Sequence, residues 1–134
     1  MRIGLDTSVV LRLLTGEPET QARRALEEFE KAIHGGGELL ISDLVVSEVY
    51  FALQHHYGVP KAEALALLAT FLGEGGVHPL GAAAAVLAEP NPATAKPGFV
   101  DRLIHAEYRQ AAKEILTFEK AAGRLPGVRV LVVV

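Results

Sequence analysis

The sequence predicts one α/β domain over residues 1–134, a three-layer α/β/α sandwich with a central, mostly parallel sheet. Three observations predict this fold. A length of 134 residues suits one hydrophobic core and is too short for two. Half of the residues (50%) are hydrophobic and 22% are charged, which is typical of a globular protein. Short apolar runs alternate with segments of helical periodicity, and this alternation favours a parallel sheet covered by helices.

The first half of the chain is divided by clear start and stop signals. The capping residues Asp6-Thr7-Ser8 end a first apolar strand, and Gly35-Gly36-Gly37 ends the longest helix. Ser42-Asp43 begins the next helix, which Gly58 and Pro60 close. The expected elements are a strand over Arg2–Leu5, helices over Val9–Leu14 and Glu19–Ile33, a strand over Glu38–Ile41, and helices over Leu44–His56 and Lys61–Leu72.

The second half contains the one clear loop, Glu89–Gly98, which is interrupted by three prolines. Around it we expect a strand over Val77–Leu80, helices over Ala82–Ala88 and Phe99–Ala112, a strand over Glu114–Phe118, and an almost continuously apolar final strand over Val128–Val134. In open parallel sheets, binding sites form at the carboxyl ends of the strands. Residues that directly follow a strand are therefore the first functional candidates.

Composition excludes several classes of protein. The chain has no cysteine, which excludes disulfides, thiolate catalysis and cysteine-based zinc sites. No apolar run reaches the ~18 residues of a membrane span, and no leader pattern opens the sequence, so we expect a soluble, cytoplasmic protein without membrane contact. The formal charge of −3 argues against nucleic-acid binding by bulk positive charge, although residues 101–134 carry six basic and four acidic side chains.

Four carboxylates stand where a site can form. Asp6 and Glu119 each follow an expected strand, and Asp101 lies near the start of a helix after the long loop. Glu48 is surrounded at helical spacing by apolar residues, namely Leu44, Val45, Phe51 and Ala52. A carboxylate on such a stripe would be buried and costly unless it is paired or bound to a cation.

Each of these carboxylates also has an ordinary structural explanation. Asp6 and Asp101 can cap helices, Glu48 can form a buried ion pair with an arginine, and Glu119 can be a surface residue. Asp43 is most simply a cap beside Ser42. Considered together, a cluster of like charges repels strongly unless a divalent cation offsets it. Ligands that are all oxygen favour Mg²⁺ or Mn²⁺ over zinc.

Other catalytic patterns are weak or absent. His55 and His56 complement the end of a helix, and His105, one turn after Asp101, can border a site or be structural. The sequence has no phosphate-binding glycine loop and no G-x-S-x-G nucleophile motif. A phosphatase of the haloacid-dehalogenase type would need a second Asp where Ser8 stands. A receiver domain would need an acidic neighbour for Asp6.

Four segments, in this order and spacing, resemble the PIN domain family. They are Ile3-Gly4-Leu5-Asp6-Thr7-Ser8, Ser42-Asp43-Leu44-Val45-Val46-Ser47-Glu48-Val49, Phe99-Val100-Asp101 and Leu116-Thr117-Phe118-Glu119. The likeness covers essentially the whole chain, and the compact length is most similar to the VapC toxins of bacterial toxin–antitoxin pairs. The resemblance implies a Mg²⁺- or Mn²⁺-dependent ribonuclease that is usually dimeric and is held inactive by a cognate antitoxin.

Carried over by position, the resemblance also implies a set of functional residues. The catalytic set is Asp6, Glu48, Asp101 and Glu119, with Asp6, Glu48 and Asp101 as the metal ligands and Thr7, Ser8 and Thr117 as supporting hydroxyls. The chain departs from the family pattern at three positions, with Ser8 in place of a common Asn, Arg102 in place of a small residue, and Glu119 in place of Asp. Because Glu119 is longer than Asp, we expect it to act through a water, so that Glu119→Gln costs only about tenfold in activity.

The expected partners follow from the same resemblance. They are an RNA substrate, an antitoxin that places an arginine among the carboxylates, and a second copy of the chain that packs through helices 44–56 and 61–72. The alternative is a catalytically weak PIN-like module that binds RNA or protein. RNA cleavage that depends on a metal separates the two.

Overall fold

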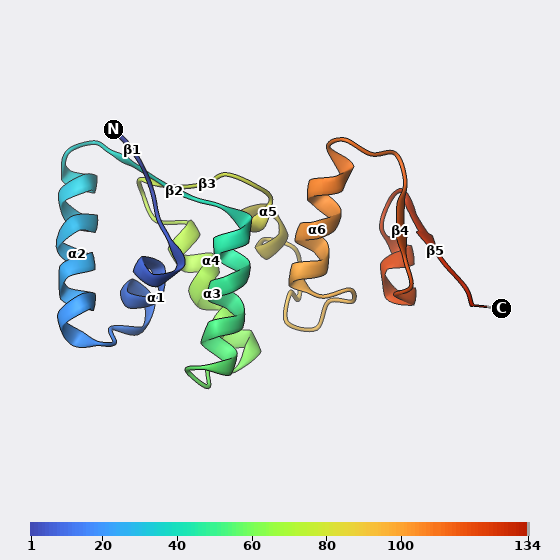
Figure 1. The fold of residues 1–134 in the computed structure, drawn as a ribbon, viewed down its shortest axis with the longest axis horizontal. Helices are drawn as coiled ribbons and strands as arrows, with labels where there is room; N and C mark the ends of the chain where they lie inside the picture. Colours follow the sequence, from blue (N-terminus) through green and yellow to red (C-terminus); the bar gives the residue numbers. More distant parts are fainter. Residues whose placement is uncertain (134) are drawn as a thin grey trace.

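A computed structural model describes residues 1–133 and shows a mixed α/β fold with parallel strands, which confirms the predicted fold class (Figure 1). In chain order the elements are β1 (Arg2–Gly4), α1 (Thr7–Thr15), α2 (Glu19–His34), β2 (Glu38–Ile41), α3 (Asp43–His55), α4 (Lys61–Leu72), β3 (Val77–Pro79), α5 (Ala83–Leu87), α6 (Phe99–Arg109), β4 (Ile115–Thr117), the short 3₁₀ helix η1 (Lys120–Arg124) and β5 (Val128–Val130). None of the helices in the described range is long and apolar enough to cross a membrane.

Every expected strand and helix is present, but the last strand is shorter than predicted. β5 ends at Val130 instead of continuing to Val134, and Val134 lies outside the described residues. β5 pairs in parallel with the three residues of β4, so the ladder ends when β4 ends. One further hydrogen bond follows, in which the Leu131 N–H donates to the Thr117 carbonyl at 2.7 Å.

The core lies between one face of a three-stranded sheet and the helices. The strand order is β1-β2-β3, all parallel. Leu39 and Ile41, which share a face of β2, are 2% and 1% exposed. The helices supply most of the remaining core, including Val46, Val49, Leu53, Leu65 and Leu68. These side chains remove a large apolar area from water, which is the main favourable term in folding.

The opposite face of this sheet is only partly covered. The strand register places Gly4, Leu40 and His78 side by side on that face. Gly4 and His78 are exposed, and Leu40 is half-buried. A parallel sheet normally has both faces covered, whereas this face remains partly in contact with water.

Helix α6 is attached to the body by its first turns. Phe99 is 2% exposed and its ring meets the ring of Tyr50 edge-on, with 5.2 Å between the ring centroids. The same burial raises the pKa of the Tyr50 hydroxyl. Leu103, one turn later, is 3% exposed. The N-terminal half of α6 is therefore part of the main core.

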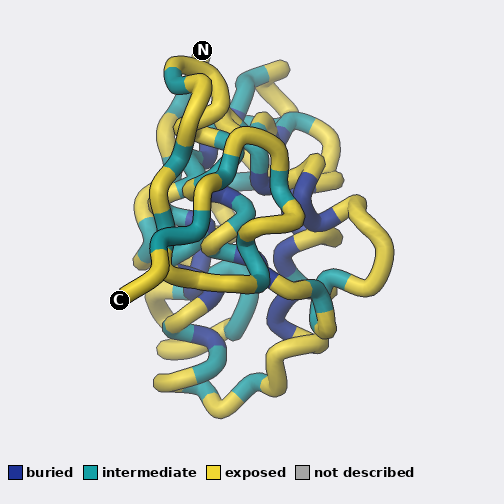
Figure 2. The backbone as a smooth tube through the Cα atoms, turned by 90° about the vertical axis from the view of Figure 1, so that its right-hand side faces the viewer, coloured by how far each residue is buried: buried dark blue, intermediate teal, exposed yellow. Residues whose placement is uncertain are grey.

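The C-terminal unit, defined as residues 113–133, lies beyond α6 at the end of the molecule opposite to β1 and α2 (Figure 1). β4 and β5 form a separate two-stranded sheet. No described residue after Leu103 is buried, and Figure 2 shows this end of the molecule largely in the colours of exposed and intermediate residues. The main core thus ends within α6, and the C-terminal unit has no core of its own.

Candidate functional site

The structure joins two of the predicted site residues directly. Thr7 begins α1 and its hydroxyl donates a hydrogen bond to the Glu48 carboxylate on α3, with 2.8 Å between Oγ1 and Oε1. Asp6 precedes Thr7 at the carboxyl end of β1, and its carbonyl accepts the Val9 and Val10 amides. The Asp6 carboxylate is exposed and does not cap the helix. Two carboxylates and a hydroxyl are therefore available at this end of the sheet.

The prediction that the Glu48 carboxylate is buried is wrong. It is exposed, because the apolar residues one turn away, Leu44 and Phe51, are themselves 73% and 46% exposed. The buried face of α3 is formed by Val46, Val49, Tyr50 and Leu53 instead. The alternative of a buried Glu48–arginine pair is also wrong, since the described part of the chain shows no ion pair to Glu48.

Glu48 lines an open groove of about 700 Å³ between α3, the start of α5 and α6. Ser47, Phe51, Ile104 and Glu107 are also part of its wall. The groove carries carboxylates on both sides, Glu48 on α3 and Glu107 on α6. It contains neither Asp6 nor Asp101 in its lining, so these two residues stand outside it.

Asp43 caps a helix, as predicted, but the helix is α5 and not α3. Ser42 caps α3, its Oγ accepting the Val45 amide at 3.2 Å. The Asp43 carboxylate instead accepts the amides of Ala82 and Ala83 at 2.9 and 3.1 Å. It therefore caps α5, a helix without a capping side chain of its own. The sequence does indicate that α5 needs a cap from elsewhere, because this helix starts in a run of alanines that cannot cap it.

Replacing Asp43 should destabilise the fold. We expect Asp43→Ala to lower the free energy of unfolding by about 2 kcal/mol, because two amide N–H groups lose a charged acceptor. Asp43→Asn retains one acceptor and should lose less. Urea unfolding of the two variants measures the difference, and an unchanged midpoint for Asp43→Ala would show that the cap contributes nothing.

Two adjacent residues in the first turn of α6, Asp101 and Arg102, have different surroundings. Asp101 lies exposed in the first turn of α6, where a negative charge is favourable. Arg102 donates to the Pro97 carbonyl at 2.8 Å, to the Lys96 carbonyl at 3.3 Å and to Glu89 at 3.0 Å. Arg102 thus holds the loop before α6 through three contacts.

The remaining predicted residues lie apart from the Thr7–Glu48 pair. Ser8 is exposed on α1. Glu119 is exposed directly after β4, and its amide donates to the Thr117 hydroxyl at 3.0 Å. Both Glu119 and Thr117 are in the C-terminal unit, which lies on the far side of α6 from β1 (Figure 1).

The oxygen ligands expected for a divalent metal have suitable chemistry, but the described residues do not gather them into one cluster. Among residues 1–133, no group of three or more His, Asp or Glu side chains lies close enough to hold an ion. Among the predicted site residues in the described chain, Thr7 makes the hydrogen bond to the Glu48 carboxylate. One hydroxyl and one carboxylate are too few oxygen ligands to hold a divalent cation firmly. The expected convergence of the four carboxylates is therefore absent within a single chain.

His55 and His105 both make structural contacts. His55 lies in the last turn of α3 and stacks on Phe51, with 6.3 Å between the ring centroids. His105 donates from Nε2 to the Pro126 carbonyl at 2.8 Å and so links α6 to the C-terminal unit. His105 is therefore a structural contact and does not border the Thr7–Glu48 pair.

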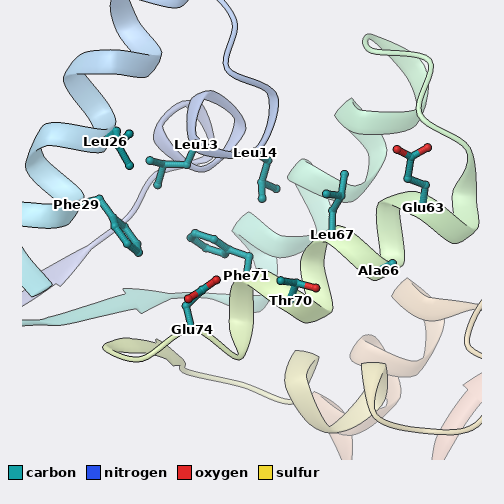
Figure 3. Close-up of a pocket in the computed structure, with 10 residues that line it drawn as sticks. All are labelled: Leu13, Leu14, Leu26, Phe29, Glu63, Ala66, Leu67, Thr70, Phe71 and Glu74. Carbon is teal, nitrogen blue, oxygen red and sulfur yellow. The ribbon is translucent and has the colours of Figure 1, made fainter.

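A second groove, of about 440 Å³, lies between α1, α2 and α4 (Figure 3). Its wall is mainly apolar, with Leu13, Leu26, Phe29 and Phe71 pointing into it. The carboxylates at its margin, Glu63 and Glu74, come from opposite ends of α4 and the turn after it. The polar groups of its lining, Glu63, Thr70 and Glu74, are spread along α4 and the turn after it.

Comparison with known proteins agrees with this arrangement of elements. The family profile described as the PIN domain matches residues 3–127. Searches of the curated proteins and of the solved structures found no significant match. The matched range begins within β1, includes the Thr7–Glu48 pair, Asp101 and Glu119, and ends before β5. The chain therefore belongs to the PIN domain family, whose members are generally nucleases.

Proposed function

We propose that this protein is a ribonuclease that hydrolyses RNA phosphodiester bonds and depends on Mg²⁺ or Mn²⁺. The observation that carries the proposal is the Thr7–Glu48 hydrogen bond beside Asp6, at the carboxyl end of β1, in a chain of the PIN family. Parallel sheets place their active sites at this end of the strands. PIN domains typically depend on a divalent metal, and the donor chemistry of the proposed set is oxygen only.

Within this site the residues have distinct tasks. The Thr7 hydroxyl fixes the orientation of the Glu48 carboxylate by donating to it. Asp6 and Glu48 can accept protons from a water and orient it toward a phosphorus atom. A divalent cation, when bound, lowers the pKa of water and offsets charge on the phosphate. One chain gathers too few carboxylates to fix the position of such an ion.

The RNA backbone also requires positive charge, and the C-terminal unit provides it. Lys113, Lys120 and Arg124 are exposed there, and their side chains make no hydrogen bond or ion pair within residues 1–133. Arg129 is paired with Glu114 instead. These unpaired cations can contact phosphates, and binding through so few charges would be modest and sensitive to salt.

A toxin role within a toxin–antitoxin pair is the finer part of this proposal. Exposed carboxylates such as Asp6 and Glu48 would suit an arginine from an inhibiting antitoxin, because arginine pairs with a carboxylate through two parallel hydrogen bonds. A small reading frame next to the gene, whose product binds the protein and stops RNA cleavage, would support it. Inhibition that persists after every basic residue in the antitoxin's binding segment is replaced would argue against inhibition by an inserted arginine.

Removal of the metal tests the proposed activity. Purified protein should cleave a labelled single-stranded RNA in Mg²⁺ or Mn²⁺, and excess EDTA should abolish cleavage. Returning Mn²⁺ in excess over EDTA should restore it. Cleavage that is equally fast in EDTA would exclude the metal-dependent mechanism. Binding of RNA without cleavage under every condition would favour the alternative, a PIN-like binding module.

A further inference from the structure

Arg102, in the first turn of α6, holds three consecutive backbone carbonyls of the segment that leads into the helix. Its side chain donates to the Lys96 carbonyl at 3.3 Å and to the Pro97 carbonyl at 2.8 Å. Its backbone amide donates to the Gly98 carbonyl at 3.1 Å. Figure 1 shows this segment at the lower end of α6. One residue therefore fixes the path by which the chain enters α6.

The Arg102 side chain is well shielded from water, and its charge is balanced. It is 20% exposed, whereas the arginine side chains in the other ion pairs of residues 1–133 are 57–67% exposed. Its partner is Glu89, with 3.0 Å between Nη1 and Oε2. A charge-assisted hydrogen bond is stronger where water is partly excluded. Arg102 therefore holds the loop more firmly than an exposed surface ion pair would.

The first turn of α6 is fixed on two sides. Phe99 and Leu103 anchor it in the core, where they are 2% and 3% exposed. Arg102 anchors it to the loop. The residue at the N-cap is a glycine, so no side chain caps this helix, and helix ends without such a partner tend to fray. The two anchors take the place of the missing cap.

Asp101 lies between these anchors and keeps a free carboxylate. Within residues 1–133 it forms no ion pair. Adjacent residues of a helix do not face each other, so Arg102 can hold the loop without pairing with Asp101. The backbone of Asp101 is thus held in place, while its side chain remains available to a ligand from outside the chain.

We propose that Arg102 is a positioning residue, which holds the first turn of α6 against the loop and so fixes the place of the Asp101 carboxylate in the nuclease site. This inference rests on the proposed nuclease function and on Asp101 as one of its metal ligands. Arg102 acts through Asp101 and contacts neither the cation nor the RNA. Placement matters because Mg²⁺ accepts oxygen ligands only within a narrow range of about 2.0–2.1 Å. Loss of a residue that orients a metal ligand typically costs roughly 10–100-fold in metal affinity or activity.

Arg102→Met tests the proposal, with Arg109→Met as its matched control. Both substitutions remove one positive charge from α6. Arg109 also donates to a backbone carbonyl, that of Lys113 at 3.2 Å, but it does so from the last turn of the helix. Electron paramagnetic resonance of free Mn²⁺ measures the affinity for the cation without any RNA. The dissociation constant for Mn²⁺ should rise roughly tenfold in Arg102→Met and stay at the wild-type value in Arg109→Met.

The double variant Asp101→Asn/Arg102→Met separates positioning from a purely structural role. Because Arg102 acts through Asp101, the double variant should cleave RNA no more slowly than Asp101→Asn alone. In Arg102→Met by itself, kcat should fall about tenfold with little change in KM. Arg102→Lys keeps the charge but cannot make all three side-chain contacts, so its rate should lie between those of Arg102→Met and the wild type. All rates are measured well below the unfolding midpoint of each variant.

The contrary results are equally defined. If Arg102→Met is less stable but binds Mn²⁺ as tightly as the wild type, Arg102 only stabilises the loop and the proposal is overturned. Additive losses in the double variant would overturn it as well, as would a wild-type protein that binds no Mn²⁺. Failure of the nuclease function has a different signature. If the wild type binds Mn²⁺ more tightly than Arg102→Met but cleaves no RNA, the positioning role stands and only the nuclease function fails.

Discussion

Asp6→Asn and Glu48→Gln should each lower RNA cleavage by roughly 10²–10³-fold, the range seen when one preorganised electrostatic group is removed from an active site. Both substitutions preserve shape and remove only a negative charge. Both side chains are exposed, so no core packing is lost. Glu48→Gln can still accept the Thr7 hydroxyl through its amide oxygen, which keeps the local geometry intact.

Glu107→Gln is the matched control for these two variants. Glu107 lines the same groove as Glu48, is exposed, and also loses one charge on substitution. It should retain near-full activity, because it lies on α6 outside the predicted set. Initial rates on the same labelled RNA, with circular dichroism to confirm folding, provide the comparison. Near-full activity in both Asp6→Asn and Glu48→Gln would mean that the site lies elsewhere.

Much of the fold could be predicted because local signals act over short distances. Gly35-Gly36-Gly37 ends α2 near His34, and Ser42 caps α3 as predicted. β2 has the predicted bounds, Glu38–Ile41, since an apolar run between glycines and a capping serine has few alternatives. The order of strands and helices then predicts a parallel sheet.

The exposure of Glu48 could not be predicted from periodicity. Leu44 and Phe51 are apolar and follow helical spacing, but the groove beside α3 leaves them in contact with solvent. A helical pattern identifies which residues share a face, and the neighbouring elements decide whether that face is covered. On α3 the buried face is the one that carries Val46, Val49 and Leu53.

The position of the C-terminal unit is a second limit of the sequence. The pattern of residues 114–118 predicts a strand, and β4 is present over Ile115–Thr117. A strand pattern does not specify which edge the strand joins, or whether that edge belongs to the same chain. The carboxyl ends of β1 and β4 were expected to converge, but within one chain they do not (Figure 1). Glu119 is therefore the predicted site residue that the structure leaves furthest from Asp6 in the order of the sheets.

Asp101→Asn should show the second large effect, because Asp101 belongs to the metal-ligand set that the family resemblance implies. We expect RNA cleavage to fall by roughly 10²-fold, the lower end of the range for loss of one preorganised charged group. Asp101 is exposed, so the substitution removes a charge without loss of core packing. Initial rates in Mn²⁺ on the same labelled RNA measure the effect, and a rate close to that of the wild type would remove Asp101 from the set.

Glu119→Gln is the comparison for this measurement. Glu119 is exposed after β4 and is expected to act through a water, so its loss should cost only about tenfold in activity. A complete loss of activity in Glu119→Gln, equal to that in Asp6→Asn, would show that Glu119 is a direct ligand.

The measurement that tests the central claim most directly is the RNA cleavage rate of Asp6→Asn in Mn²⁺, compared with the wild type and with Glu107→Gln. A nuclease site at the carboxyl end of β1 predicts a rate roughly 10²–10³-fold below that of the wild type, with Glu107→Gln close to the wild type. Cleavage by Asp6→Asn at the wild-type rate would contradict the assigned site.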